Sequence, residues 1–408
     1  MVDNSLQAQV DAQMLEQGAF TPLDLLFNSG RLLYSDYESW RRREIEFLDG
    51  VLMGNPDKIK AEIEQAVGYA RRIKLVEQPQ EFHAWHTEGA KAANAASSER
   101  PLRISMDPQL QRLIGSRYVR AQSVPQMDLF FDNPVVALTN GIVQALSTRN
   151  LPGAQQKLDQ LYAQAPTHAD LPAFDQLLIA LRHLGHPVAE AREELAFLVE
   201  VSPAARRLLG TQSRDLLSPL WTQLAQALTD IPFDPNEPNL HRSFALSQAQ
   251  DWAGVNDCVH AEPDWQDHAA LCLRLVESGF HQRQRVAALT AWCHFCWRAP
   301  TKASQAVTRL HQPELTVLWQ RFQDDEDDED DELTEADFPA VLLLREPGLA
   351  LQLPENLPTG NTSSEQHYRT VHQWIHARRG RQHDVELALR KKLQAEHAGL
   401  FELLKNSV

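Results

Sequence analysis

Cysteine and glycine are scarce in this chain. Four of its 408 residues are Cys and seventeen are Gly. So few Cys at irregular spacing argue against a disulfide framework and fit a reducing compartment. The Gly residues are not grouped, and the sequence contains no phosphate-cradling loop, nucleophile elbow or dinucleotide fingerprint. We therefore expect a protein that is not an enzyme and needs no cofactor.

Long apolar runs are also missing from the sequence. No stretch approaches the roughly 18 consecutive apolar residues that a membrane span needs. Residues 1–7 lack the positive start and apolar centre of a signal peptide. Together with the few Cys, these features predict a cytoplasmic protein without a membrane partner.

Basic residues are outnumbered by acidic ones in the middle of the chain. The formal net charge is -16, and residues 126–332 carry 15 Lys and Arg against 29 Asp and Glu. Nine of these acids are consecutive, at 324–332. Binding to phosphates requires the opposite sign, so nucleic acid is not expected as the main partner. A protein or peptide partner of basic character is favoured instead.

One short pattern occurs three times between residues 138 and 300. Each copy has Ala, an apolar residue four positions later, another three further on, and Pro five beyond that. On an α-helix the first three positions share a face, the small Ala admits a neighbouring helix, and Pro marks where the helix has ended. The three copies are Ala154, Leu158, Leu161 and Pro166; Ala191, Leu195, Leu198 and Pro203; and Ala288, Trp292, Phe295 and Pro300.

The pattern resembles the second helix of the tetratricopeptide repeat family. The first two copies lie 37 residues apart, close to the period of about 34 in that family. The first-helix signature is mostly absent, because Cys272, Leu275-Val276 and Gly279 stand where the family prefers Trp, Leu-Gly and Tyr. The resemblance implies an all-α solenoid of stacked helical hairpins that binds a protein segment in a concave groove, with no catalytic residues.

Helix starts and composition breaks divide the chain into five parts. Thr21-Pro22, Ser35 with Glu38, and Asn55-Pro56 predict the starts of three short N-terminal helices, and Ser218-Pro219 predicts another in the repeats. Phe338 to Leu344 predicts a buried helix. We expect a three-helix unit at 1–86, a linker at 87–132, tetratricopeptide-like repeats at 133–322, an acidic disordered loop at 323–337 and a C-terminal helical cap at 338–408.

Basic residues cluster twice in the predicted N-terminal unit, at 41–43 and at 71–74. Three short helices with such clusters could form a DNA-reading domain. Alternatively, the unit is a cap packed on the repeats, and its charges are solvated. The near balance of 15 basic and 17 acidic residues in 1–125 favours the second interpretation.

The linker carries the residues Gln126, Met127, Asp128, Leu129 and Phe130. This five-residue segment resembles the peptide by which bacterial replication and repair proteins dock on the sliding clamp. A Gln amide at a pocket rim and adjacent Leu and Phe anchors make such docking chemically reasonable. The alternative is that Leu129 and Phe130 are buried where the linker packs on the first repeat helix.

All four Cys lie in the second half of the chain, at Cys258, Cys272, Cys293 and Cys296. The two-residue gap in Cys293-His294-Phe295-Cys296 also occurs in zinc and redox pairs. This pair lies within a predicted helix that carries Trp292 and Trp297. We therefore favour structural Cys on a buried helix face, with zinc binding as the alternative.

The C-terminal part contains a His pair and a basic cluster. His372 and His376 lie one turn apart and resemble the zinc-protease helix, but Gln373 replaces the general-base Glu, so we do not expect peptidase activity. Close by are Arg378, Arg379 and Arg381. These Arg residues either contact nucleic acid or pair with the acidic surface of the protein.

Overall fold

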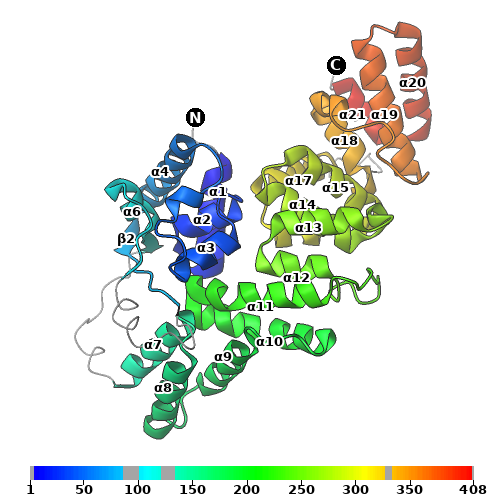
Figure 1. The fold of residues 1–408 in the computed structure, drawn as a ribbon. Helices are drawn as coiled ribbons and strands as arrows, with labels where there is room; N and C mark the ends of the chain where they lie inside the picture. The colour runs from blue at the N-terminus through cyan, green and yellow to red at the C-terminus, as the bar shows by residue number, and fades with distance from the viewer. Residues whose placement is uncertain (1–3, 86–100, 121–133, 327–332, 407–408) are drawn as a thin grey trace. The chain divides into compact units, whose positions relative to one another are not determined.

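The computed structural model of the protein describes residues 4–85, 101–120, 134–326 and 333–406. Within these ranges the regular secondary structure is helical, apart from one small sheet (Figure 1). The all-α class predicted from the sequence is thus confirmed. The chain divides into two compact units, Met1–Asp251 and Trp252–Val408.

The first unit begins with short helices around a three-stranded antiparallel sheet. The sheet has the order β1-β3-β2, with Phe20 opposite Tyr118 and Val76 opposite Val119. The elements of this part are α1 (Asn4–Gln17), β1 (Ala19–Phe20), α2 (Pro22–Asn28), α3 (Tyr34–Arg41), a 3₁₀ turn (Asp49–Val51), α4 (Pro56–Arg72), β2 (Leu75–Pro79), α6 (Pro108–Ile114) and β3 (Ser116–Arg120).

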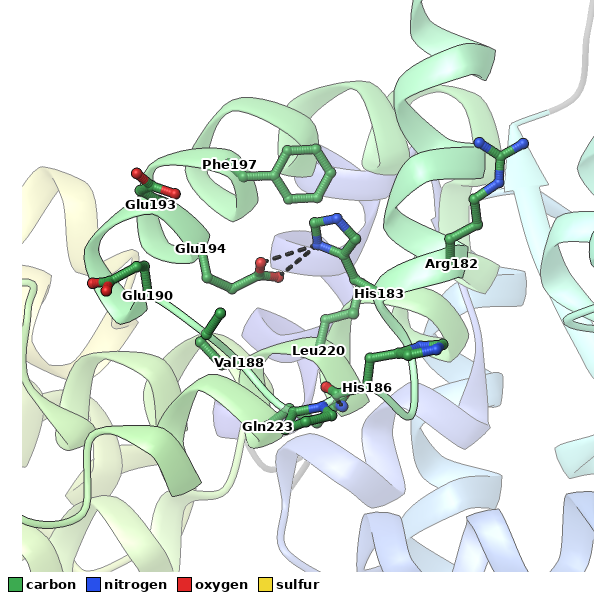
Figure 2. Close-up of a pocket in the computed structure, with 12 residues that line it drawn as sticks. Arg182, His183, His186, Val188, Glu190, Glu193, Glu194, Phe197, Leu220 and Gln223 are labelled. Atoms are coloured by element: carbon green, nitrogen blue, oxygen red, sulfur yellow. Dashed lines mark hydrogen bonds and ion pairs between the residues drawn. The ribbon is translucent and has the colours of Figure 1, made fainter.

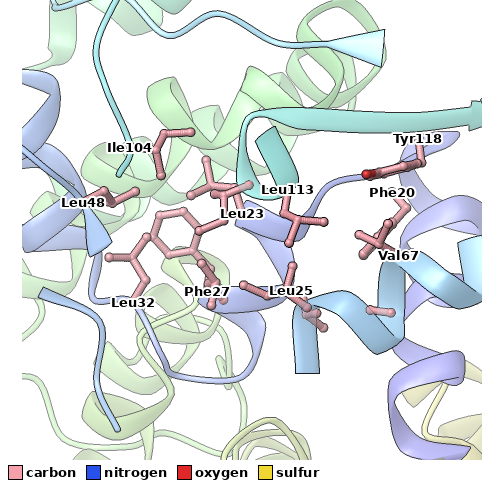
Figure 3. Packing of buried hydrophobic residues seen from close by; sticks show 14 of the residues in the cluster. Phe20, Leu23, Leu25, Phe27, Leu32, Leu48, Val67, Ile104, Leu113 and Tyr118 are labelled. Atoms are coloured by element: carbon pink, nitrogen blue, oxygen red, sulfur yellow. The ribbon is translucent and has the colours of Figure 1, made fainter. Parts of the chain in front are cut away.

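One hydrophobic core joins the sheet to these helices (Figure 3). Phe20, Leu26 and Val67 are buried in it, together with Ile104 and Tyr118. The last two lie in the stretch for which the sequence predicted a linker. Residues 101–120 therefore belong to the core of the N-terminal part, and the expectation of a linker over all of 87–132 was wrong for them.

The rest of the first unit is a series of helices in which each contacts the next (Figure 1). Their succession is α7 (Pro134–Ser147), α8 (Leu151–Gln164), α9 (Leu171–His183), α10 (Ala191–Leu209), a 3₁₀ turn (Gly210–Gln212), α11 (Ser213–Ala227) and α12 (Arg242–Ala249).

A buried ion pair connects α3 to α11 inside the first unit. Arg41 Nη1 lies 2.7 Å from Asp215 Oδ2, and the Tyr37 hydroxyl donates to Asp215 Oδ1 at 2.9 Å. Both charged side chains are at most 6% exposed. Burial lowers the pKa of Arg41, but Asp215 and Tyr37 raise it by more, so the guanidinium keeps its proton. The N-terminal part is therefore joined to the helical series by a permanent charge pair.

The second unit is a further series of helices. They are α13 (Trp252–Ala261), α14 (Ala269–His281), α15 (Arg285–Arg298), α16 (Ala303–Leu310), α17 (Pro313–Glu326), α18 (Phe338–Arg345), α19 (Ser363–Arg379), α20 (His383–Glu396) and α21 (Ala398–Asn406), with 3₁₀ turns at Trp265–Asp267, Pro300–Lys302, Glu335–Asp337 and Pro347–Leu351. The buried helix predicted at Phe338 to Leu344 is confirmed, because every residue of this stretch is buried in α18.

Two helix starts predicted in the N-terminal part are confirmed, and one is wrong. The Thr21 hydroxyl accepts from the Asp24 N–H at 3.1 Å, and Asn55 Oδ1 accepts from the Lys58 N–H at 3.2 Å. The predicted capping box at Ser35 does not form, since α3 begins at Tyr34 with Leu33 at the cap, two residues before the predicted cap.

Pro219 lies inside α11, so the helix start predicted at Ser218-Pro219 is wrong. A Pro within a helix removes the N–H that would bond to the carbonyl four residues earlier. Here that carbonyl belongs to Asp215, and the Arg149 guanidinium donates to it from Nη2 at 3.0 Å. A side chain distant in sequence thus replaces the lost hydrogen bond and allows the helix to continue.

The three copies of the sequence pattern differ in the structure. In the first and third, Ala154 and Ala288 are buried within α8 and α15, and the helix ends before Pro166 and Pro300. The second copy departs from this rule, because Ala191 opens α10 and Pro203 lies inside it. A tetratricopeptide-like solenoid remains a prediction that two of the three copies fit.

The third copy explains what the small residues do. Gly279 on α14 lies against Ala288 on α15, and a Cβ at Gly279 would be 2.9 Å from the Ala288 Cβ. That separation is below the normal contact distance, so the two helix backbones approach as closely as side chains allow. Two small residues are required at this crossing.

No helix in the described part of the chain is long and apolar enough to cross a membrane.

Candidate functional site

The first unit has a groove formed by three consecutive helices (Figure 2). It lies at the end of α9, the start of α10 and the middle of α11, and has a volume of about 510 Å³. We call it the α9–α11 groove. Its lining consists of Arg182, His183, His186, Pro187, Val188, Ala189, Glu190, Glu193, Glu194, Phe197, Leu220 and Gln223.

The loop between α9 and α10 forms one side of the groove. Gly185 has a φ of +83°, which lets the chain turn directly after the helix. The Gln223 side chain on α11 then holds the loop: Nε2 donates to the His186 carbonyl at 2.9 Å, and Oε1 accepts from the Gly185 N–H at 3.4 Å. The loop is therefore fixed to the third helix of the groove.

An aromatic pair and an ion pair form the inner surface of the groove. The His183 ring lies 4.8 Å from the Phe197 ring, centroid to centroid. His183 Nδ1 lies 3.0 Å from Glu194 Oε2, and the Glu194 side chain is only 13% exposed. Glu194 thus fixes the imidazole ring against Phe197 and provides a rigid, partly apolar face (Figure 2).

Two further acids stand at the rim of the groove. Glu190 and Glu193 are exposed, and no ion pair between described residues engages either carboxylate. Glu193 also lies in the first turn of α10, where a negative charge interacts favourably with the helix dipole. On the other side, the Arg182 Nη2 donates to Gln155 Oε1 at 2.7 Å. The rim therefore offers carboxylates to a cationic group.

Other residues than those of the sequence pattern line this groove. The pattern residues on α10, Leu195 and Leu198, are on the half-buried and buried sides of the helix. Two sequence signals could have located the groove: the Gly185-His186-Pro187 break and the grouping of three Glu between 190 and 194. The sequence pattern identifies residues that pack between neighbouring helices. The groove is lined by other residues of the same helices, which the pattern does not mark.

The segment that resembles a clamp-binding peptide lies outside the described residues; it consists of Gln126, Met127, Asp128, Leu129 and Phe130. The acidic run is partly described: α17 continues to Glu326, and a 3₁₀ turn occupies Glu335–Asp337. The acidic loop predicted for 323–337 was therefore wrong at both ends.

The four Cys are free thiols. Cys293 and Cys296 are fully buried on α15, and Cys272 is buried on α14. Burial raises the pKa of Cys272 to about 12 and raises the pKa values of Cys293 and Cys296 as well. Thiols that keep their protons at neutral pH are poor nucleophiles, so their environment fits the structural interpretation over redox chemistry.

His372 and His376 on α19 have backbone partners. His372 Nε2 lies 2.9 Å from the Leu353 carbonyl oxygen, and His376 Nε2 lies 2.9 Å from that of Ala350. A carbonyl only accepts, so both nitrogens carry protons. The two rings therefore hold the end of the Pro347–Leu351 turn and the residues just after it on α19.

The three Arg of the basic cluster differ in environment. The guanidinium of Arg378 lies over Trp374, 5.3 Å from the ring centre. Arg379 and Arg381 are exposed. In the N-terminal cluster, by contrast, Arg41 is buried in its pair with Asp215, and Arg42 Nη2 lies 3.0 Å from Glu38 Oε1. Two residues of this N-terminal cluster thus have partners within the protein. The cap interpretation expected solvated charges, and for Arg41 that expectation was wrong.

The sequence reasoning missed one group of side chains. Asp337, His367 and His397 come together in the second unit, with one ligand atom of each lying within 4.8 Å of the others. The three residues are 30 positions apart, and no local motif marks them. Only the fold brings them together.

No protein-family model, no curated protein and no solved structure matches this chain.

Proposed function

We propose that this protein is a non-enzymatic interaction scaffold that binds a basic segment of another protein in the α9–α11 groove. The observation that carries the proposal is the pair of exposed carboxylates, Glu190 and Glu193, beside the rigid face of His183 and Phe197. A Lys or Arg side chain fits this arrangement, because its charged end would meet the rim while its aliphatic stem packs on the rings.

The way the groove is built supports a binding role. Its walls come from α9, α10 and α11, and Gln223 holds the intervening loop by two hydrogen bonds. A surface that is fixed before the partner arrives loses little conformational entropy on binding. Residues 126–251 of the first unit hold 14 Asp and Glu against 8 Lys and Arg, and this excess of acids adds attraction for a basic partner. We propose a cytoplasmic location, in keeping with the four free thiols.

The test is binding of defined fluorescent peptides, measured by polarisation with the full-length protein. Twelve-residue peptides with zero, two or four Lys or Arg and one shared apolar anchor should bind in order of increasing charge. Charge reversal by Glu190→Lys with Glu193→Lys should weaken binding of the most basic peptide by about tenfold or more, and added salt should have a similar effect.

A matched control is Glu200→Lys, on the same helix but outside the groove, where Glu200 is exposed and accepts from Gln176 Nε2. This variant should bind as the wild type does. Equal affinity for neutral and basic peptides would overturn the proposal. If the groove variant and the Glu200 variant weakened binding equally, the overall charge of the protein would explain the binding without the groove. That result would also overturn the proposal.

A second candidate function is docking on the bacterial sliding clamp. Its basis is the five-residue match at Gln126 to Phe130 in the sequence. A peptide of residues 125–132 should compete with a known clamp ligand, and a scrambled peptide should not. Leu129→Ala with Phe130→Ala in the full-length protein should abolish clamp binding, because the two apolar anchors supply most of the energy of such a contact. Unchanged clamp binding by that variant would exclude this function.

A further inference from the structure

The group formed by Asp337, His367 and His397 is a built cluster in the second unit. Asp337 ends the 3₁₀ turn before α18, His367 lies on α19, and His397 lies between α20 and α21. The side chains are 3%, 9% and 9% exposed. Three segments that are distant in sequence thus place polar side chains at one buried point.

The ligand atoms lie near one another. His367 Nδ1 is 3.3 Å from Asp337 Oδ1, and His397 Nε2 is 3.5 Å from the other oxygen, Asp337 Oδ2. With one ligand atom taken from each residue, all three lie within 4.8 Å of one another. In a tetrahedral site with bonds of about 2.0–2.1 Å, neighbouring ligand atoms are about 3.3–3.4 Å apart, so the three side chains would have to move slightly closer together around a zinc ion.

The carboxylate is oriented by a further pair of contacts. The Thr334 hydroxyl donates to Asp337 Oδ2 at 2.7 Å, and the Thr334 N–H donates to the same oxygen at 3.2 Å. Supporting hydrogen bonds of this kind fix metal-binding carboxylates in known sites. Asp337 is thus held in place independently of the two His residues.

Two ring nitrogens of the cluster must lose their protons before they can bind a metal ion. An ionised carboxylate only accepts, so the nitrogens that face Asp337 carry protons in the metal-free protein. On metal binding each proton moves to the other ring nitrogen or to solvent. For His397 that nitrogen, Nδ1, now accepts from the Leu400 N–H at 3.3 Å. If the proton moved to His397 Nδ1, this nitrogen could no longer accept from the Leu400 N–H. Leu400 lies in the first turn of α21, where an N–H has no partner within the helix, so this N–H would need another acceptor.

We propose that Asp337, His367 and His397 bind a divalent transition-metal ion of the zinc type, which fastens the α20–α21 segment to α18 and α19. Nitrogen and carboxylate ligands of this set suit zinc and its neighbours in the first transition row. The low exposure of the three side chains means that most of the coordination shell would be shielded from solvent. A fourth ligand would be a water molecule.

The experiment adds Zn²⁺ to chelator-treated full-length protein and measures bound zinc per chain by mass spectrometry under native conditions and the melting temperature by circular dichroism. We expect one tightly bound zinc ion per chain and an increase in melting temperature of several degrees. Co²⁺ should give the visible absorption of a tetrahedral site. The variants His397→Gln and His367→Gln should each weaken zinc binding by at least tenfold.

His376→Gln is the matched control, because His376 belongs to the other His pair and bonds to a backbone carbonyl. It should bind zinc as the wild type does. Absence of stoichiometric zinc from the folded wild type overturns the proposal, whatever the variants do. Equal zinc binding by the wild type and a folded His397→Gln variant also overturns it.

Discussion

The two units bury ionisable side chains in different proportions. The first unit joins its parts with Arg41 and Asp215, a pair in which the cation keeps its proton at every physiological pH. The second unit also buries charged groups, Arg274 and Glu365, but it buries three imidazoles, those of His294, His367 and His372, whereas the described part of the first unit buries one, that of His241. His294 lies between Trp265 and Trp297 on one side of α15, and His367 and His397 face Asp337. Imidazoles exchange protons and bind metals near neutral pH.

This difference indicates that the two units respond to their surroundings in different ways. The charge pair of the first unit should act as a fixed joint, indifferent to pH over the normal range. The second unit should be sensitive to acid and to metal ions. Four experiments, from the largest expected effect to the smallest, test this contrast and the roles of the other features.

Removing one partner of the fixed joint should have the largest effect. Asp215→Ala leaves the Arg41 guanidinium buried without its anion, so we expect the free energy of unfolding of the first unit to fall by about 3–5 kcal/mol. Urea unfolding followed by circular dichroism measures it. Asp159→Ala, at a surface carboxylate that accepts from Gln155, is the control. A loss below about 1 kcal/mol would mean that the joint is not a strong one.

Acid should destabilise the second unit through His294. Burial first of all, and then the Arg298 charge, lower the pKa of His294 to about 4. The unfolded chain, with a pKa of about 6.5, therefore binds a proton that the folded chain does not. The contribution of His294 is fully present above pH 6.5 and is lost as the pH falls toward 4. We expect a loss of about 2–3 kcal/mol, since one pKa unit is about 1.4 kcal/mol.

Urea unfolding between pH 4 and pH 7, followed by Trp fluorescence, measures the acid effect. The variant His294→Phe should show a smaller slope of stability against pH in this window. The Asp215→Ala variant should keep the full slope, because the fixed joint has no imidazole. Identical slopes for His294→Phe and the wild type would remove His294 as the cause.

The close crossing of α14 and α15 should tolerate no added methyl group. Gly279→Ala would place a Cβ at 2.9 Å from both the N and the Cβ of Ala288, and we expect a loss of about 1–3 kcal/mol. Gly68→Ala on α4 is the opposite case, because nothing lies within 4 Å of the added Cβ. That variant should gain about 0.5–1 kcal/mol from helix propensity. Equal effects of the two changes would contradict the close-packing explanation.

The groove variant should have the smallest effect on stability. Glu190→Lys with Glu193→Lys changes only exposed side chains, but it places two positive charges at the start of α10, so we expect the free energy of unfolding to fall by about 1 kcal/mol or less. Thermal unfolding by circular dichroism checks this. A larger loss would show that the two acids stabilise α10, and their effect on peptide binding would then need the Glu200→Lys control for its interpretation.

Local chemistry made several parts of the fold predictable. Thr21 and Asn55 cap helices because a short polar side chain before Pro accepts an N–H of the first turn. The apolar run at 338–344 could only be buried. The small residues of the third copy were correctly identified as helix-contact residues, since Ala288 meets Gly279.

Tertiary contacts decided what the sequence could not. Pro219 predicted a helix start and Pro203 a helix end, but both lie inside helices. Arg149 supplies the hydrogen bond that Pro219 removes, and Val199, four residues before Pro203, lies at the surface. Residues 101–120 read as a linker because their role in the core depends on strand pairing with 75–79. The Asp337 cluster joins residues 30 positions apart, and periodicity in a single sequence does not predict contacts between residues so far apart.

The Arg41–Asp215 pair also bears on how this protein could change in evolution. Arg41 comes from the N-terminal part and Asp215 from the helical series, and each is the buried counter-charge of the other. Recombination that replaced one segment by a foreign one without the matching charge would therefore leave the remaining charge buried and unpaired. The first 251 residues should be inherited as one indivisible block, however readily the side chains at the rim of the α9–α11 groove diverge.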